Sequence, residues 1–61
     1  MTIITVYISR HKGDVLSYRH SDIDSAIAFA TKQYEKPCVI SYSVTIADGN
    51  RLGVVAHQHK E

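Results

Sequence analysis

Hydrophobic and polar residues alternate near both ends of this 61-residue chain, and they follow a helical period in its middle. Alternation with a period of two is typical of a strand with one buried face, and a period near 3.6 is typical of an amphipathic helix. The alternating segments are rich in β-branched and aromatic residues, which favours strands. The pattern predicts strands at about 2–10, 15–20, 38–48 and 51–57, and a helix at about 22–35.

Glycine, serine and proline residues mark where these elements begin and end. Gly13 and Gly49 can adopt positive φ. The residues around Gly13 and the segment Asp48-Gly49-Asn50 are therefore each expected to form the tight turn of a hairpin. Ser21 is expected to cap the helix, and acidic residues follow it where the helix dipole favours negative charge. Pro37 disfavours helical geometry in the preceding residue and should end the helix.

The order ββαββ predicts an α+β fold, a single small domain over residues 1–61 with one helix packed on one face of a four-stranded antiparallel sheet. In the last two strands, the residues expected to face the helix are Cys38, Ile40, Tyr42, Val44, Ile46, Leu52, Val54 and Ala56. The residues expected on the other face are Thr5, Tyr7, Ser9, Ser41, Ser43 and Thr45. That face is flat and rich in hydroxyl groups, and it is either plain solvent surface or a docking surface.

Phe29 is the residue that the helical pattern does not explain. At about 100° of rotation per residue, one stripe faces the sheet and consists of Ile23, Ala26, Ile27, Ala30 and Tyr34. Phe29 lies roughly 120° from the centre of that stripe. Beside Lys32 and Gln33, it is either an aromatic anchor for a partner protein or a side chain that leans over an edge strand. The unpaired sheet edges offer a partner a second route, by strand addition.

Composition and charge argue against several classes of function. Seven basic and six acidic residues give a net charge of +1, which provides no electrostatic reason for a nucleic-acid or membrane partner. No apolar stretch approaches the roughly 18 residues of a membrane span, and the N-terminus lacks a signal-peptide pattern. We therefore expect a cytoplasmic protein. A chain this short buries only about 60% of its unfolded surface, so formation of a homodimer would add stability.

The four histidines and Cys38 are the residues with catalytic or metal-binding chemistry. A structural zinc normally takes four ligands, whereas His57-Gln58-His59 supplies two. Acid–base catalysis needs groups held together, and the sequence places no two histidines together. A lone cysteine forms no internal disulfide. We expect that this protein is not an enzyme and that it has neither a metal site nor a cofactor. The alternatives are a reactive Cys38, a ribonuclease-like pair of histidines and direct nucleic-acid binding.

At Ala30-Thr31-Lys32-Gln33-Tyr34 the sequence resembles the Dmd family, small antitoxins of T-even-type bacteriophages. The likeness covers most of the chain: a similar length, a Val-rich first strand, an aromatic residue directly before Ala-Thr, and a strand with a short acidic turn after it. The resemblance implies a protein without catalytic activity or cofactor that binds host mRNA-endonuclease toxins of the RnlA and LsoA type. It also implies that Phe29 contacts the toxin, while Cys38 stands where the family would have a polar residue.

The resulting hypothesis is an antitoxin that acts in the cytoplasm of an infected bacterial host cell. It would fill the RNA cleft of the toxin, with acidic groups such as Asp22, Asp24 or Asp48 facing a basic groove. The residues expected to bind the partner are Phe29, Lys32, Gln33, Cys38 and Asp48. Other small phage inhibitors share an amphipathic helix that ends in Gln-Tyr, and some act on host RNA polymerase. An inhibitor of that kind is the alternative.

Overall fold

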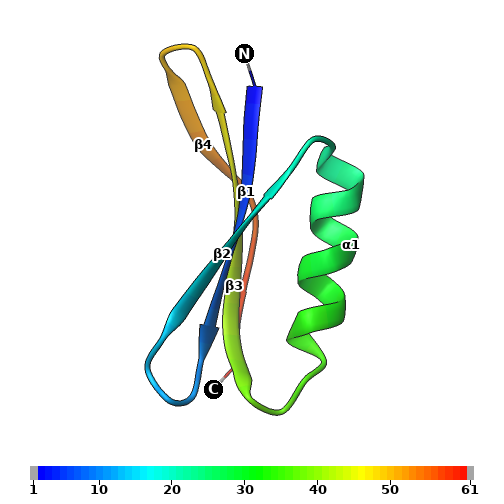
Figure 1. The fold of residues 1–61 in the computed structure, drawn as a ribbon, viewed down its shortest axis with the longest axis vertical. Coiled ribbons are helices and arrows are strands. Elements are labelled where there is room, and N and C mark those ends of the chain that lie inside the picture. Colours follow the sequence, from blue (N-terminus) through cyan, green and yellow to red (C-terminus); the bar gives the residue numbers. More distant parts are fainter. Residues whose placement is uncertain (1, 61) are drawn as a thin grey trace.

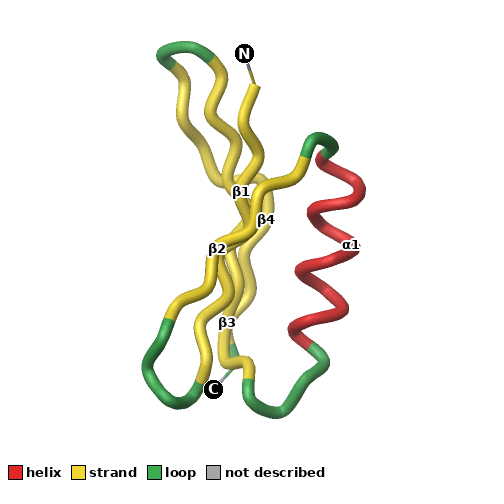
Figure 2. The backbone as a smooth tube through the Cα atoms, in the orientation of Figure 1, coloured by secondary structure: helices red, strands yellow, loops and turns green. Residues whose placement is uncertain are grey.

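The chain folds in the predicted order of two strands, one helix and two strands (Figure 1). A computed structural model describes residues 2–60. Its elements are β1 (Thr2–Arg10), β2 (Val15–His20), α1 (Ile23–Tyr34), β3 (Val39–Asp48) and β4 (Arg51–His59). The strands form one antiparallel sheet in the order β2-β1-β3-β4, and α1 lies along one face (Figure 2). The predicted α+β fold is confirmed. Within residues 2–60, no helix is long and apolar enough to cross a membrane.

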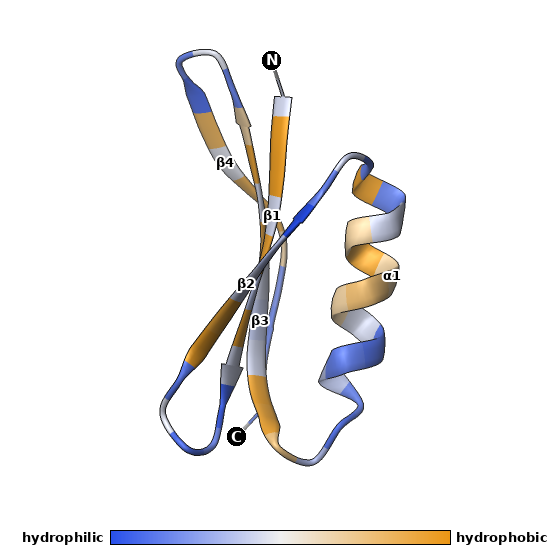
Figure 3. Ribbon diagram, in the orientation of Figure 1, coloured by the Kyte–Doolittle hydropathy of each residue, from blue (hydrophilic) through white to orange (hydrophobic). Residues whose placement is uncertain are grey.

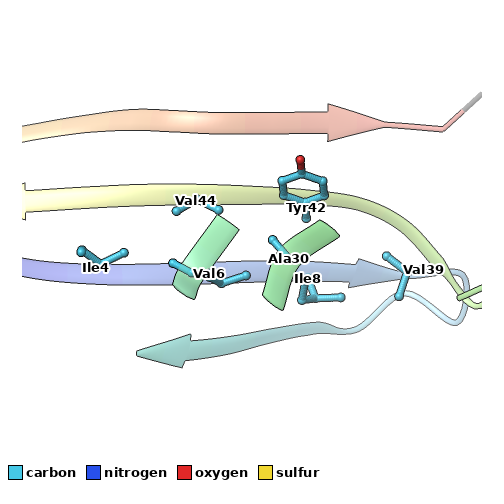
Figure 4. Close-up of a cluster of buried hydrophobic side chains, with 8 residues drawn as sticks. Ile4, Val6, Ile8, Ala30, Val39, Tyr42 and Val44 are labelled. Atoms are coloured by element: carbon cyan, nitrogen blue, oxygen red, sulfur yellow. The ribbon is translucent and has the colours of Figure 1, made fainter. Parts of the chain in front are cut away.

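The core lies between α1 and the two central strands, β1 and β3 (Figure 4). Its buried side chains are Ile4, Val6, Ile8, Ala26, Ala30, Val39, Tyr42 and Val44. Ala26 and Ala30 are fully buried in α1, and their small side chains let the helix approach the sheet closely. The rings of Tyr34 and Tyr42 meet edge to face, with centroids 5.2 Å apart. This contact closes the core beside the last turn of the helix.

Asp22, and not Ser21, caps the start of α1. The backbone of Asp22 is extended, and its carboxylate accepts a hydrogen bond from the amide of Ser25 at 2.9 Å. A carboxylate in this position satisfies a free amide and meets the positive end of the helix dipole. At the other end, the amide of Lys36 bonds to the carbonyl of Gln33 at 3.0 Å, before Pro37.

Val39 faces the core, although the sequence predicts that Cys38 and Ile40 do. The register between β1 and β3 shifts next to Arg10, which pairs with Val39 and leaves Ile40 as an extra residue. Such a bulge reverses the alternation of side chains beyond it. Val39 is therefore buried, while Cys38 lies exposed before the strand begins.

A second bulge, in β4, changes the face of the sheet on which the residues before it lie. Val55 is the extra residue between the pairs that β4 makes with Val44 and Thr45 of β3. Residues directly opposite each other on neighbouring strands share a face of the sheet. By this register, Leu52 and Val54 lie on the face turned away from α1. The prediction that they face the core is wrong.

The end of β4 is also more ordered than predicted. The sequence predicts that the last strand ends at about residue 57, but the strand continues to His59, and residue 61 lies outside the described residues. The amide of Lys60 donates to the carbonyl of Ile40 at 2.7 Å, and its Nζ donates to the carbonyl of Lys36 at 3.0 Å. Lys60 Nζ also lies 4.8 Å from the ring centroid of Tyr34. These contacts attach the end of β4 to β3 and to the residues after α1.

The turn between β1 and β2 is held by an ion pair. Arg10 Nε donates to Asp14 Oδ1 at 3.0 Å, and a second Arg10 nitrogen contacts Oδ2 of the same carboxylate. Gly13 has φ +93°, which favours glycine at this position. The hydrogen bond from Arg10 lowers the pKa of Asp14 below its ordinary value, and the same bond raises the pKa of Arg10.

Candidate partner-binding surfaces

Phe29 lies half-buried at the edge of the sheet, between α1 and β2. Its ring meets Tyr18 edge to face, with centroids 4.8 Å apart and an interplanar angle of 63°. Phe29 makes a second ring contact with His20, and the centroids of these two rings lie 5.1 Å apart. Phe29 therefore leans over an edge strand, as one of the two interpretations of the sequence expects. This aromatic edge cluster (Tyr18, His20, Phe29) also remains partly open to solvent, since Tyr18 is 38% exposed.

Lys32 and Gln33 continue this surface along α1. They follow Phe29 by three and four positions, which makes the three residues neighbours on a helix. Lys32 is exposed and Gln33 is half-buried, and the last turns of α1 are hydrophilic (Figure 3). We call the aromatic edge cluster together with Lys32 and Gln33 the helix-edge surface. Aromatic rings of this kind are typical of interface anchors, and Lys32 and Gln33 place hydrogen-bond donors beside them.

Cys38 and Asp48 lie at opposite ends of β3. Cys38 precedes the strand, and its carbonyl accepts a hydrogen bond from the amide of His11 at 2.9 Å. Asp48 ends the strand opposite Arg51, in the hairpin that joins β3 to β4. Ten residues of strand span roughly 30 Å. The structure therefore places Cys38 towards the end of the molecule where α1 terminates, and it places Asp48 far from Cys38.

Charged residues are distributed unequally along the molecule. Asp22 and Asp24 begin α1 at the end of the long axis where Asp48 lies in the β3–β4 hairpin (Figure 1). The four lysines lie towards the other end, in the β1–β2 turn, in the last turn of α1 and the segment after it, and after β4: Lys12, Lys32, Lys36 and Lys60. The three carboxylates considered for a basic groove thus share one end of the molecule.

The second candidate surface is the face of the sheet turned away from α1, which we call the open face. Its centre carries Thr5, Tyr7, Ser43 and Thr45, as predicted. One end carries a cross-strand row of Ile3, Ala47 and Leu52, and Val54 lies in the next row. Leu52 is 81% exposed and Val54 is 64% exposed. Sequence reasoning missed this apolar end, because the bulge in β4 is not visible in the alternation of its hydrophobic residues.

Comparison with known proteins finds no match: no family model, no curated protein and no solved structure is similar to this chain. Over residues 2–60 the surface opens into no pocket. In the same part of the chain, no three histidine, cysteine, aspartate or glutamate side chains gather where they could bind a metal. The features that bear on function are therefore the two surfaces and the resemblance at residues 30–34.

Proposed function

We propose that this protein is an antitoxin that binds a host mRNA-endonuclease toxin of the RnlA or LsoA type through the helix-edge surface. The observation that carries the proposal is the aromatic edge cluster, in which Tyr18 and His20 hold Phe29 at the rim of the domain. Binding hot spots are enriched in aromatic residues. A ring that neighbouring rings already hold loses little conformational freedom on binding, which favours affinity.

The resemblance to the Dmd family supports the proposal through only part of the shared segment. Ala30 is fully buried and Tyr34 packs on Tyr42, so these two residues serve the fold. Phe29 and Lys32, with Gln33 beside them, reach the surface of the same helix. These three residues are the part of the segment that could contact a toxin.

Inhibition would follow from occlusion, because a domain seated in the toxin's RNA cleft prevents RNA from entering. The end of the molecule that carries Asp22, Asp24 and Asp48 would face the basic groove that binds RNA, although Arg51, opposite Asp48, offsets one of these charges. Such complementarity speeds association and gives specificity more than it gives affinity. Exposed charges are screened beyond about 8 Å at physiological ionic strength. Salt should therefore slow association, while the aromatic anchor maintains the complex.

The test combines capture of the purified toxin with a titration of its RNA cleavage. Cleavage should fall to zero at about one antitoxin per toxin. Phe29→Ala should weaken capture by about 30-fold or more, because truncation of a hot-spot residue costs about 2 kcal/mol or more. Lys32→Ala should also weaken capture, because it removes a side chain beside Phe29. Lys12→Ala is its matched control, since it removes the same charge in the β1–β2 turn, and any general effect of lower positive charge is common to both variants.

Circular dichroism and thermal melting would establish that each variant is folded. If folded Phe29→Ala captured the toxin as well as the unchanged protein does, Phe29 would be purely structural and the proposed site would be wrong. A pull-down from infected host cells gives an independent outcome. Recovery of RNA polymerase subunits in place of the toxin would replace this function with the alternative inhibitor.

A further inference from the structure

We propose that two copies of this chain associate through their open faces and form a homodimer with both helices on the outside. The first observation is the area that the single chain exposes, which is 4363 Å². A folded monomer of 6.8 kDa is expected to expose about 3,950 Å² from the scaling of surface with mass. The excess is about one-tenth. Because α1 packs on one face of the sheet, the open face remains in solvent.

Exposed apolar side chains gather on the open face. Among residues 2–60, four of the six exposed large hydrophobic residues belong to it: Tyr7, Val15, Leu52 and Val54. Complete burial of one leucine or valine side chain contributes roughly 1.5–3 kcal/mol. Leu52 and Val54 adjoin Ala47 and Ile3 in one cluster, whereas Val15 lies at the opposite end of the face. A contiguous exposed apolar cluster of this kind can mark an interaction site.

The area of the open face lies at the lower limit for a stable dimer interface. The two longest dimensions of the molecule are 34 and 19 Å, so the sheet presents a footprint of at most about 650 Å². Specific interfaces bury about 600–1,000 Å² on each partner, so the dimer has to bury nearly the whole of this face. Sheets pack face to face about 10 Å apart. The small hydroxyl side chains at the centre, Thr5, Ser43 and Thr45, leave room for that approach and for the larger Tyr7 of the facing copy.

The charges on the open face also fit self-association. Its paired residues include no carboxylate within residues 2–60. Its cation, Arg19, lies on the edge strand β2, and its histidines, His57 and His59, lie on the opposite edge strand β4. A two-fold axis brings the same patch of both copies together. A patch with a neutral centre and its cation at the rim buries no pair of like charges in such a dimer, because the rim stays hydrated.

The dimer does not depend on the proposed function. The helix-edge surface lies on the side of the sheet that carries α1, so it stays accessible when two open faces meet. A dimer would present two such surfaces to two toxin molecules. Loss of dimer formation and loss of toxin binding should therefore respond to different substitutions.

Sedimentation velocity of the full chain, from about 1 µM to about 1 mM, tests the proposal. We expect a mass of about 13.6 kDa, twice the 6.8 kDa of one chain, and a melting temperature that rises with concentration. Leu52→Lys and Ser43→Arg place a charge on the open face and should each raise the dissociation constant of the dimer at least tenfold. Ala28→Lys places the same charge on an exposed position of α1 and should leave it unchanged.

A monomer at every concentration would overturn the proposal, and so would an equal effect of Ala28→Lys. A monomer whose toxin capture is abolished by Leu52→Lys would also overturn it, and would assign the open face to the toxin. Failure of the proposed function looks different, because folded Phe29→Ala would then capture toxin normally and the mass would still be that of a dimer. Leu52 is 81% exposed, so its replacement leaves the core intact.

Discussion

The contact between Phe29 and Tyr18 should make a measurable contribution to the stability of the domain. Their centroids lie 4.8 Å apart at an angle of 63°, within the edge-to-face geometry that contributes about 0.5–1.5 kcal/mol beyond simple burial. Because Tyr18 is 38% exposed, we expect the lower half of that range, about 0.5–1 kcal/mol. A chain of 61 residues has a free energy of unfolding of roughly 3–9 kcal/mol. The coupling between Phe29 and Tyr18 is therefore a substantial fraction of the total free energy of unfolding.

A double-mutant cycle isolates this coupling. Phe29→Leu, Tyr18→Leu and the double variant would be unfolded with urea at one fixed protein concentration and followed by circular dichroism. The control cycle combines Phe29→Leu with Tyr34→Leu, because Tyr34 packs on Tyr42 of β3 and not on Tyr18. The control pair should be additive within about 0.3–0.5 kcal/mol. A coupling between Phe29 and Tyr18 no larger than the control would refute the reasoning, and Phe29 would no longer count as a pre-positioned anchor.

Three further predictions test the local structure. Asp22→Ala should lower the free energy of unfolding by about 1 kcal/mol because it removes the cap of α1, whereas Ser21→Ala should change it by less than about 0.5 kcal/mol; equal losses in urea denaturation would contradict the cap. Val6→Ala removes two methyl groups from a fully buried position and should cost about 2 kcal/mol; a loss below about 0.5 kcal/mol would contradict that placement. The hydrogen bond from Arg10 lowers the pKa of Asp14, so the stability that this pair contributes is present above the ordinary pKa of 3.8 and is lost as the pH falls through the lowered pKa. Melting temperatures measured against pH should therefore fall more steeply on the acid side than those of Asp14→Asn, and parallel curves would show that the pair contributes nothing.

The order and type of the elements could be predicted because each depends on local signals. Period-two alternation, the helical stripe, Gly13, Gly49 and Pro37 all act within a few residues. The choice between Ser21 and Asp22 as the helix cap could not be made in this way, since both side chains can accept a hydrogen bond from the first turn. Only the extended backbone of Asp22 and its bond to Ser25 decide between them.

The faces of β3 and β4 were predicted incorrectly wherever a bulge intervenes. A bulge is defined by how a strand pairs with its neighbour, so it leaves no mark on the alternation within the strand itself. Leu52, Val54 and Ala56 alternate as if all three shared a face, yet the extra residue Val55 separates Ala56 from the other two. The apolar end of the open face is therefore a consequence of non-local pairing.

The candidate site was predictable to the extent that it lies on one helix. The angular position of Phe29 indicates a residue at the margin of the core, and the structure places it there. The identity of its neighbours, Tyr18 and His20, depends on β2 being the edge strand beside β1, which the sequence does not reveal. The distance between Cys38 and Asp48 follows from the length of β3, so these two residues cannot belong to one small contact area with Phe29.

The bulge in β4 also bears on how this protein associates with a partner. An edge strand invites pairing with another strand because its backbone groups are free, and bulges blunt such edges. Val55 interrupts the regular spacing of backbone groups near the middle of β4, and the same bulge leaves Leu52 and Val54 exposed on the open face. Strand addition at β4 is thus disfavoured by the feature that makes the face apolar. Association through the face should leave the outer amides of β4 open to hydrogen exchange, whereas edge pairing would protect them.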